Sequence, residues 1–362
     1  MRRMIGIEQV EDIALGAAVL GTGGGGDPYI GKLMAAEAIR GFGPVELVTI
    51  DEVGDDEMSV CIAMMGAPTV MVEKIPGGDE CTQAFRAIES FLGKTVKYVY
   101  SIEAGGINST IPITLAARLR LPMIDLDGMG RAFPEIQMVT HNLFGITATP
   151  FTMADEKGNS AVLATIDNHW METFARSITV NMGATAHIAC YAASGKQQRE
   201  AAVYGTMSLA EQIGRAIREA RAGHATVVDS IQKVTGGFRI FHGKIADVQR
   251  RTVAGFARGE TVLEGIGEDS GSRMSIQFQN ENLVAARDGQ IVVSVPDLIT
   301  MVEEETGEPI TTEQLRYGFR VVTLGIPCHK HWRTPKALKV VGPRYFGYDI
   351  DYVPVEERFD RS

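Results

Sequence analysis

The chain has few cysteines: 4 in 362 residues, at Cys61, Cys81, Cys190 and Cys328. They are scattered along the chain, and no two of them have the short spacing that is typical of a metal-binding cysteine pair. We therefore expect reduced thiols and a cytoplasmic location. Excess positive charge is also absent, because the formal net charge is −10 at pH 7. That balance argues against nucleic acid or an anionic membrane as the main partner.

Long apolar runs are missing too, so we expect no segment that crosses a bilayer. The N-terminal residues 1–4 lead into acidic residues rather than an apolar stretch, which argues against a signal peptide. What is present is typical of a globular enzyme, with 45% hydrophobic and 22% charged residues. The length is sufficient for two domains with substantial cores.

The first half alternates strand-like and helix-like segments, which favours a largely parallel sheet covered by helices. The expected strands are 45–50, 60–65, 96–102 and 122–126, the expected helices are 8–20, 29–39, 81–92 and 111–119, and 151–166 is an expected hairpin. We therefore predict an α/β fold, with an N-terminal α/β domain over residues 1–168.

The second half changes character after a long helical pattern at 208–221. Short strand-like runs separated by turn residues follow it and predict a C-terminal β-rich domain over residues 169–353. The expected strands are 239–241, 245–248, 252–256, 274–278, 283–286, 291–295, 298–302 and 320–324. The aromatic, glycine-rich tail at 342–353 is expected to return to the first domain.

Glycine occupies five of the six positions from 21 to 26. Such a run lets the backbone bend sharply or approach a ligand closely, so Gly23, Gly24 and Gly25 are candidate substrate-binding residues. Asp27 suits a helix N-cap and Pro28 the first helical position, so free N–H groups would face an anion or a developing oxyanion. The competing interpretation is a flexible loop between helices.

Two familiar phosphate-binding loops are excluded or disfavoured at this position. No Lys-Ser/Thr pair follows the glycines, so the segment is not a P-loop. The segment before it has helical rather than strand periodicity, which disfavours a dinucleotide-binding turn.

Polar residues follow two expected strands of the first half. Glu103, Gly106 and Asn108 follow one strand, and Asp125 and Asp127 follow the other. Open α/β sheets bind ligands at the carboxyl ends of their strands, so we expect these groups to converge on one crevice. Paired carboxylates can divide acid and base roles or hold a divalent cation. The competing interpretation is that Asp125 or Asp127 caps a turn and Glu103 pairs with a surface cation.

His187 lies in a run of small and polar residues, Thr179 to His187. It is a candidate general acid or base. The competing interpretation is a hydrogen-bonded core histidine.

Several longer motifs carry a family resemblance along nearly the whole chain. They are Gly-Thr-Gly-Gly-Gly-Gly-Asp-Pro at 21–28, Glu-Ala-Gly-Gly-Ile-Asn at 103–108, the run from Asp125 to Glu135, and, in the second half, the segments at 296–299, 306–312, 315–318 and 341–349. With these motifs the chain resembles the S-methyl-thiohydantoin desulfurase family. The resemblance implies a two-domain protein, often associated with hydantoinase- or oxoprolinase-type proteins.

The implied reaction is hydrolytic loss of methanethiol from an S-methylated thiohydantoin, leaving a hydantoin. Glu103 or Asp127 would activate water, and Asn108 with the glycine-loop N–H groups would hold the ring heteroatoms. We expect a small-molecule substrate, no cofactor and self-association. A divalent metal is the less favoured alternative, because no histidine lies beside the acids. The alternative function is a non-catalytic subunit or ligand-binding module that supports a hydantoinase-type partner.

Overall fold

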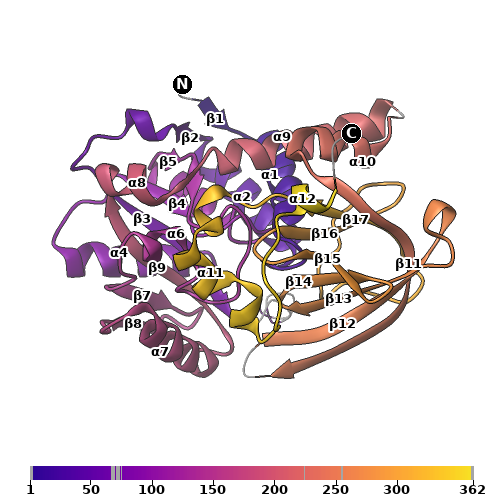
Figure 1. Ribbon diagram of the computed structural model, residues 1–362. Helices are drawn as coiled ribbons and strands as arrows, with labels where there is room; N and C mark the ends of the chain where they lie inside the picture. The colour runs from indigo at the N-terminus through magenta and orange to yellow at the C-terminus, as the bar shows by residue number, and fades with distance from the viewer. Residues whose placement is uncertain are drawn as a thin grey trace.

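The computed structural model describes residues 3–66, 70, 74, 76–223, 225–253 and 256–359. Two sheets organise the chain (Figure 1): an eight-stranded sheet built from the first 194 residues and a seven-stranded sheet built from residues 238–326. Helices of the first half lie along the region between them. The expected α/β first half and β-rich second half are therefore confirmed.

The first sheet has the strand order β1-β2-β5-β4-β3-β9-β7-β8. In that order the strands are Arg3–Ile5, Val45–Val48, Met123–Ile124, Tyr98–Ser101, Met58–Gly66, Thr185–Ser194, Phe151–Ala154 and Ser160–Leu163. The four central strands, β2, β5, β4 and β3, run parallel, while the outer pairings are antiparallel. Strand β3 is buried along nearly its whole length, which explains its almost continuous apolar sequence.

The helices between residues 7 and 235 pack on the first sheet or on one another. They are α1 (Ile7–Leu20), α2 (Pro28–Phe42), α4 (Glu80–Leu92), α5 (Ile111–Leu119), α6 (Thr140–Leu143), α7 (Asn168–Asn181), α8 (Gly195–Ala201), α9 (Thr206–Gly223) and α10 (Val227–Thr235). A short ladder joins β6 (Leu126–Asp127) to β10 (Val203–Tyr204), and η1 spans Ile50–Glu52. None of the helices in the described residues has the length and apolar character that a membrane span requires.

The second sheet is antiparallel throughout, in the order β15-β14-β13-β12-β11-β17-β16. In that order the strands are Gln290–Ser294, Glu281–Arg287, Arg273–Gln279, Phe256–Gly265, Phe238–Val253, Arg320–Ile326 and Leu298–Glu303, with η2 at Gly267–Asp269. The expected separate strands at 239–241 and 245–248 are wrong. They form the single strand β11, whose register shifts at two irregularities, one near Ile240 and one near Ala246.

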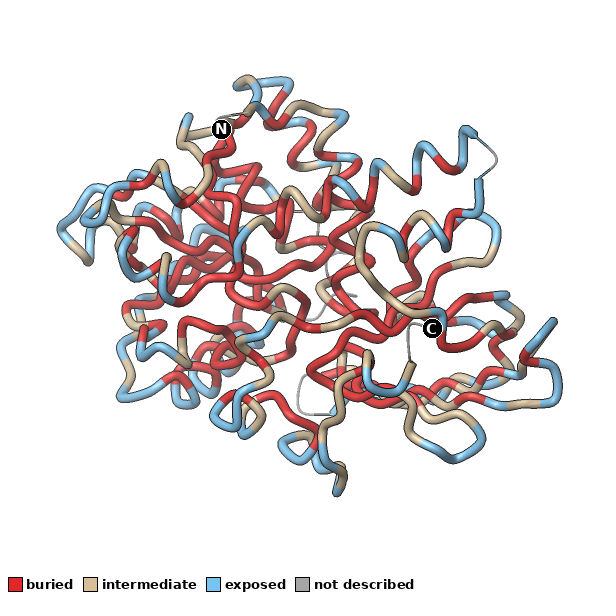
Figure 2. Tube along the Cα trace, turned by 45° about the horizontal axis from the view of Figure 1, so that its top comes forward, coloured by how far each residue is buried: buried red, intermediate tan, exposed pale blue. Residues whose placement is uncertain are grey.

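Buried residues form two hydrophobic clusters. The larger one joins the first sheet and its helices to residues of the second sheet such as Leu283 and Leu298. The smaller cluster lies within the second half. Figure 2 shows buried backbone running through the centre and exposed residues at the outer loops. The two halves therefore share a core, which places a site at their junction inside a firmly packed region.

The C-terminal segment contacts the first half of the chain. It contains η3 (Lys330–Arg333), α11 (Pro335–Val341), η4 (Pro343–Phe346) and α12 (Val355–Arg358). In Figure 1 it is the yellow segment that runs between the two sheets. The Trp332 indole N–H donates to the Met129 carbonyl at 2.7 Å, and the Tyr345 hydroxyl donates to Glu135 at 2.7 Å. Strand β9, which follows residue 168, also belongs to the first sheet, while the domain limits at 168 and 169 stay a prediction.

Candidate active site

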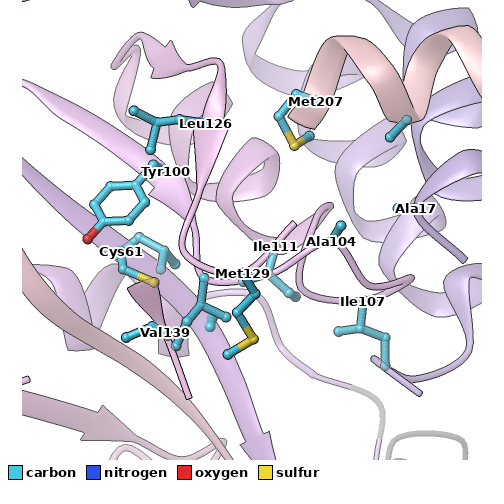
Figure 3. Packing of buried hydrophobic residues seen from close by; sticks show 14 of the residues in the cluster. Ala17, Cys61, Tyr100, Ala104, Ile107, Ile111, Leu126, Met129, Val139 and Met207 are labelled. Atoms are coloured by element: carbon cyan, nitrogen blue, oxygen red, sulfur yellow. The ribbon is translucent and has the colours of Figure 1, made fainter. Parts of the chain in front are cut away.

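The glycine loop packs backbone against backbone on the loop that follows β4. Gly25 and Gly26 have φ values of +72° and +76°, which side-chain-bearing residues rarely adopt. A Cβ on Gly25 would lie 2.5 Å from the Gly105 Cα, and one on Gly26 would lie 2.5 Å from the Ile107 Cδ1. The Ile107 N–H donates to the Gly25 carbonyl at 3.0 Å. Only glycine permits this approach. Figure 3 shows Ile107 among the buried side chains of the larger cluster, to which Ala104 and Met129 also belong.

Glu103 and Asn108 form a fixed pair in that second loop. The Asn108 side-chain amide donates to Glu103 Oε1 at 2.8 Å, and the Phe133 N–H donates to Glu103 Oε2 at 3.3 Å. Asn108 Oδ1 in turn accepts from the Met64 N–H of β3 at 2.8 Å. Both carboxylate oxygens therefore accept hydrogen bonds, and the orientation of the carboxylate is set by three separate segments.

Burial raises the pKa of Glu103 from its usual 4.5 to about 7. The side chain is only 5% exposed, and the low-polarity surroundings disfavour its charged form. Hydrogen bonds from Asn108 and Phe133 and the charge of Arg131 lower the pKa, but by less. Glu103 therefore changes protonation state near neutral pH, which is the condition a general base needs.

A second buried carboxyl, Glu281, comes from the start of β14 in the other half of the chain. Its Oε2 has no hydrogen-bond partner among the described residues. Burial raises the pKa of Glu281 well above its usual value, and the charge of Glu103 raises it further. A Cβ on Gly24 would lie 2.0 Å from Glu281 Oε1, so the Glu281 carboxyl occupies the space that a side chain at position 24 would need.

Arg131 is fully buried and joins the two halves. Its Nη1 donates to the carbonyls of Pro296 at 2.8 Å and Asp297 at 3.0 Å, and its Nε donates to the Ala132 carbonyl at 2.9 Å. Its Nη2 has no partner among the described residues. Burial lowers the pKa of Arg131 to about 10, so the guanidinium stays charged at neutral pH.

Glu103, Asn108, Glu281 and the glycine loop surround a cavity of about 90 Å³ at the junction of the two halves. We call it the central cavity. Its lining comes from the glycine loop, β3, β9, the two loops beyond β4 and β6, helix α7, and the β13–β14 turn. The lining residues are Gly25, Gly26, Ala63, Met64, Met65, Gly66, Ile102, Glu103, Ile107, Asn108, Met129, Phe133, Pro134, Glu135, Ile136, Glu172, Arg176, Ile188, Asn280 and Glu281.

Family models match nearly the whole sequence. The S-Me-THD-like N-terminal domain matches residues 8–165, and the S-Me-THD-like C-terminal domain matches residues 166–355. The chain belongs to the S-Me-THD-like family. The expected resemblance to S-methyl-thiohydantoin desulfurases is confirmed at the level of the family.

A solved structure shares the fold of this S-Me-THD-like chain. It is the X-ray crystal structure of a protein from Chromobacterium violaceum, with a TM-score of 0.83 and 23% sequence identity. The match covers 98% of this chain and 100% of the other. At this identity the likeness shows the fold alone. No curated protein matches the sequence.

The structure does not bring Asp125 and Asp127 to the central cavity of this S-Me-THD-like protein. Asp125 accepts from the Ser208 N–H at 3.0 Å and so caps the first turn of α9. Asp127 lies on β6 and accepts from the Gly130 N–H at 2.9 Å and the Thr206 hydroxyl at 3.0 Å. Burial raises the pKa of Asp127 to about 8. The β6–β10 ladder holds this carboxyl at the start of α9, because it fixes Asp127 opposite Val203.

His187 is also separate from the central cavity. It lies on β9 next to Ile188, and neighbouring strand residues point to opposite faces of a sheet, so Ile188 lines the cavity while His187 faces Glu80 and Lys74. Its Nε2 has no hydrogen-bond partner among the described residues. Burial lowers the pKa of His187 to about 4, so the ring is neutral at physiological pH.

The remaining predicted residues shape the loops rather than line the cavity. Asp27 caps α2 by accepting from the Tyr29 N–H at 2.8 Å, which confirms the expected helix start. Gly23 has a φ of +87° and its Cβ position is occupied by Asn282. Gly106 leaves room for the Gly26 carbonyl, which would lie 2.5 Å from a Cβ.

Sequence reasoning missed Glu281, and it gave Glu172, Arg176 and Asn280 no role. The signal near Glu281 is weak: a polar run, Gln279 to Asn282, interrupts two apolar strands without the glycine usual in a tight turn. Asn280 supplies the positive φ, +57°, that the turn needs. Within the described ranges, no three histidine, cysteine, aspartate or glutamate side chains form a group that could hold a metal ion.

Proposed function

We propose that this protein is a hydrolase that removes the methylthio group of an S-methylated thiohydantoin. Water attacks the amidine-like ring carbon, methanethiol leaves, and a hydantoin forms. Two findings support the proposal: the chain belongs to the S-Me-THD-like family, and a base suited to water activation lines its central cavity.

The proposal depends most on the position of Glu103 at the cavity and on its pKa. A base for this reaction must be ionised at neutral pH yet basic enough to take a proton from water. A pKa of about 7 meets both conditions. Its orientation is fixed before substrate binds, because Asn108 and the Phe133 N–H hold both oxygens.

The glycine loop supports the same chemistry. Gly25 and Gly26 line the cavity, and their backbone N–H groups donate to no other described residue. In the proposed complex these donors face the ring heteroatoms and stabilise the charge that develops during attack. Apolar walls from Met64, Met129 and Phe133 keep bulk water away from the reacting carbon.

In the first step Glu103 takes a proton from water as the water oxygen bonds to the ring carbon. The electron pair of the C=N bond moves onto the ring nitrogen as the C–O bond forms, and this nitrogen takes up one proton. As the tetrahedral intermediate collapses, its hydroxyl gives up one proton, the C=O bond forms and the C–S bond breaks. The protonated Glu103 delivers its proton to the leaving sulfur and returns to its starting state.

The test is incubation of the purified protein with an S-methyl-thiohydantoin, with detection of free thiol and hydantoin. A panel of hydantoins, thiohydantoins and their S-methyl derivatives defines the substrate. We expect thiol release from S-methylated rings by the protein alone. The absence of thiol release from the whole panel, with the protein alone and with a hydantoinase-type protein added, would overturn the proposal.

A surface feature favours the second candidate, a subunit that supports a hydantoinase-type partner. Ile166 is 88% exposed and lies beside the exposed rings of Trp170 and Phe174, whose centroids are 5.4 Å apart. Exposed apolar groups gathered in this way are typical of protein interaction sites. Thiol release or hydantoin turnover that requires the added partner would support this candidate over the first.

A further inference from the structure

Glu281 differs from Glu103 in what its oxygens touch. Glu103 accepts a hydrogen bond at each oxygen, as an ionised carboxylate prefers. Glu281 is 3% exposed, lines the same cavity, and has an Oε2 without a partner among the described residues. A buried carboxylate with an oxygen that accepts no hydrogen bond is costly, so this site favours the neutral acid, which carries a proton to donate.

The charged groups around Glu281 come from three segments. Glu103 lies on the loop after β4, Arg131 on the loop after β6, and Glu313 on the loop before β17, and all three act on Glu281. The two carboxylates disfavour a further negative charge. Arg131 opposes them, but its Nε and Nη1 are committed to backbone carbonyls. Burial is the largest contribution, so the pKa of Glu281 lies well above its usual value.

From this arrangement we infer that Glu281 is the general acid of the proposed reaction, donating its proton to the ring nitrogen as Glu103 activates water. The inference rests on the proposed function and supplies the proton donor that it requires. The two catalytic residues come from different halves of the chain, which explains why the cavity lies at their junction. Gly24 is the positioning residue, since a side chain there would displace the Glu281 carboxyl.

The proton balance closes over the two steps. During attack, the water proton moves to Glu103, the C–O bond forms, and the Glu281 proton moves to the ring nitrogen as the C=N π bond breaks. During collapse, the hydroxyl of the intermediate returns a proton to Glu281 as the carbonyl forms. The C–S bond breaks and the proton on Glu103 moves to sulfur. The products are the hydantoin and methanethiol, and both residues regain their starting states.

Glu281→Gln tests the assignment, because glutamine keeps the shape and a hydrogen-bond donor but cannot transfer a proton. We expect kcat to fall by ~10²–10⁴-fold, as for loss of a general acid, while the inhibition constant of the hydantoin product stays the same. The pH profile of kcat/KM should lose its fall at high pH and keep its rise near pH 7. The matched control is Glu80→Gln, a buried glutamate outside the central cavity, which should retain both limbs.

A second measurement uses the wild-type protein and so does not depend on the variant folding. A substrate alkylated on both ring nitrogens is already cationic and needs no proton there. Its turnover should not fall at high pH, whereas that of the neutral substrate should. Full activity of Glu281→Gln, or an equal fall for both substrates, would overturn the role of Glu281. A wild-type protein that releases no thiol from any substrate would instead overturn the proposed function itself.

Discussion

At the scale of single residues, burial raises the pKa of two carboxyls, of which only one lines the central cavity. Glu103 and Asp127 are both buried, and burial raises the pKa of each, to about 7 and about 8. A raised pKa therefore does not identify the base by itself. What separates them is the cavity: the carboxyl of Glu103 lines it, whereas Asp127 is bound to Gly130 and Thr206.

The first prediction concerns Glu103→Gln. The variant should fold normally but lose ~10²–10⁴-fold in kcat, because the amide cannot accept the proton of water. In the wild type, kcat/KM should rise with pH through about 7 as Glu103 ionises. Thiol release measured across pH checks both statements. A variant that keeps full activity would exclude Glu103 as the base.

The second prediction concerns Asp127→Asn, for which we expect most of the activity to remain. The folded protein holds the Asp127 proton more tightly than the unfolded chain does, because burial raises the pKa from 3.8 to about 8. Its contribution to stability is therefore complete below pH 3.8 and is lost as pH rises through about 8. Urea unfolding should show a shallower decline between these pH values in the variant than in the wild type. A large loss of kcat would assign Asp127 to the reaction instead.

At the scale of elements, the contact between the glycine loop and the 103–108 loop is the feature that shapes the cavity. Gly25→Ala should destabilise the protein by about 3 kcal/mol or more, because the methyl group combines a strained positive φ with a clash against Gly105. Activity should fall as well, because the two loops must separate. Urea unfolding and thiol release measure the two effects.

Gly93→Ala is the matched control for that variant. Gly93 also has a positive φ, +60°, but nothing lies within 4 Å of its Cβ position. The strain alone should cost about 1 kcal/mol and leave activity unchanged. If both variants lose the same stability and activity, close packing of the loops is not what requires glycine at position 25.

Local patterns predicted most elements of the fold but not their connections. Helix α5 begins and ends where its apolar spacing indicates, and the hairpin of β7 and β8 forms as expected. The sequence predicts short separate strands where β11 is a single strand, because its two register irregularities break the alternation of apolar and polar residues. Strand β12 was largely missed, since glycine and charged residues interrupt its pattern. Pairing of β9 with β3 depends on contacts between distant residues, which no local pattern carries.

Local patterns also predicted the part of the site that comes from single loops, but not the part that depends on packing of the two halves. Glycine-rich segments and the end of β4 predicted Gly25, Glu103 and Asn108, and the structure brings these together in the central cavity. Glu281 was not predictable, because in sequence it is one charged residue at the start of a strand. Its role follows from its burial at the cavity that Glu103 also lines, 178 residues earlier in the chain. Only the packing of the two halves brings both residues to one cavity.

At the scale of the whole molecule, buried polar contacts bind the two halves together around the cavity. The Thr300 hydroxyl of β16 donates to the Val19 carbonyl of α1 at 2.6 Å, and the Asn282 N–H donates to the Thr22 carbonyl at 2.8 Å. Arg131 adds two bonds to carbonyls of the second half. The halves should therefore unfold together rather than as independent domains.

Arg131→Met tests this coupling and the electrostatics of the cavity at once. The variant should lose about 3–5 kcal/mol of stability, because it leaves the carbonyls of Pro296 and Asp297 unpaired and removes a cation from beside buried carboxyls. The charge of Arg131 lowers the pKa of Glu103, so its removal should raise that pKa. The rise in kcat/KM should then move to a pH above about 7.

Arg218→Met is the control, because Arg218 binds Asp12 and joins α9 to α1 away from the cavity. It should lower stability without moving the pH profile. Urea unfolding and thiol release across pH separate the two outcomes. If Arg131→Met loses stability while kcat/KM still rises at the same pH, then Arg131 stabilises the contact between the two halves but does not affect the pKa of Glu103. A shift of that rise would show that Arg131, which joins the two halves, also sets the protonation of the base.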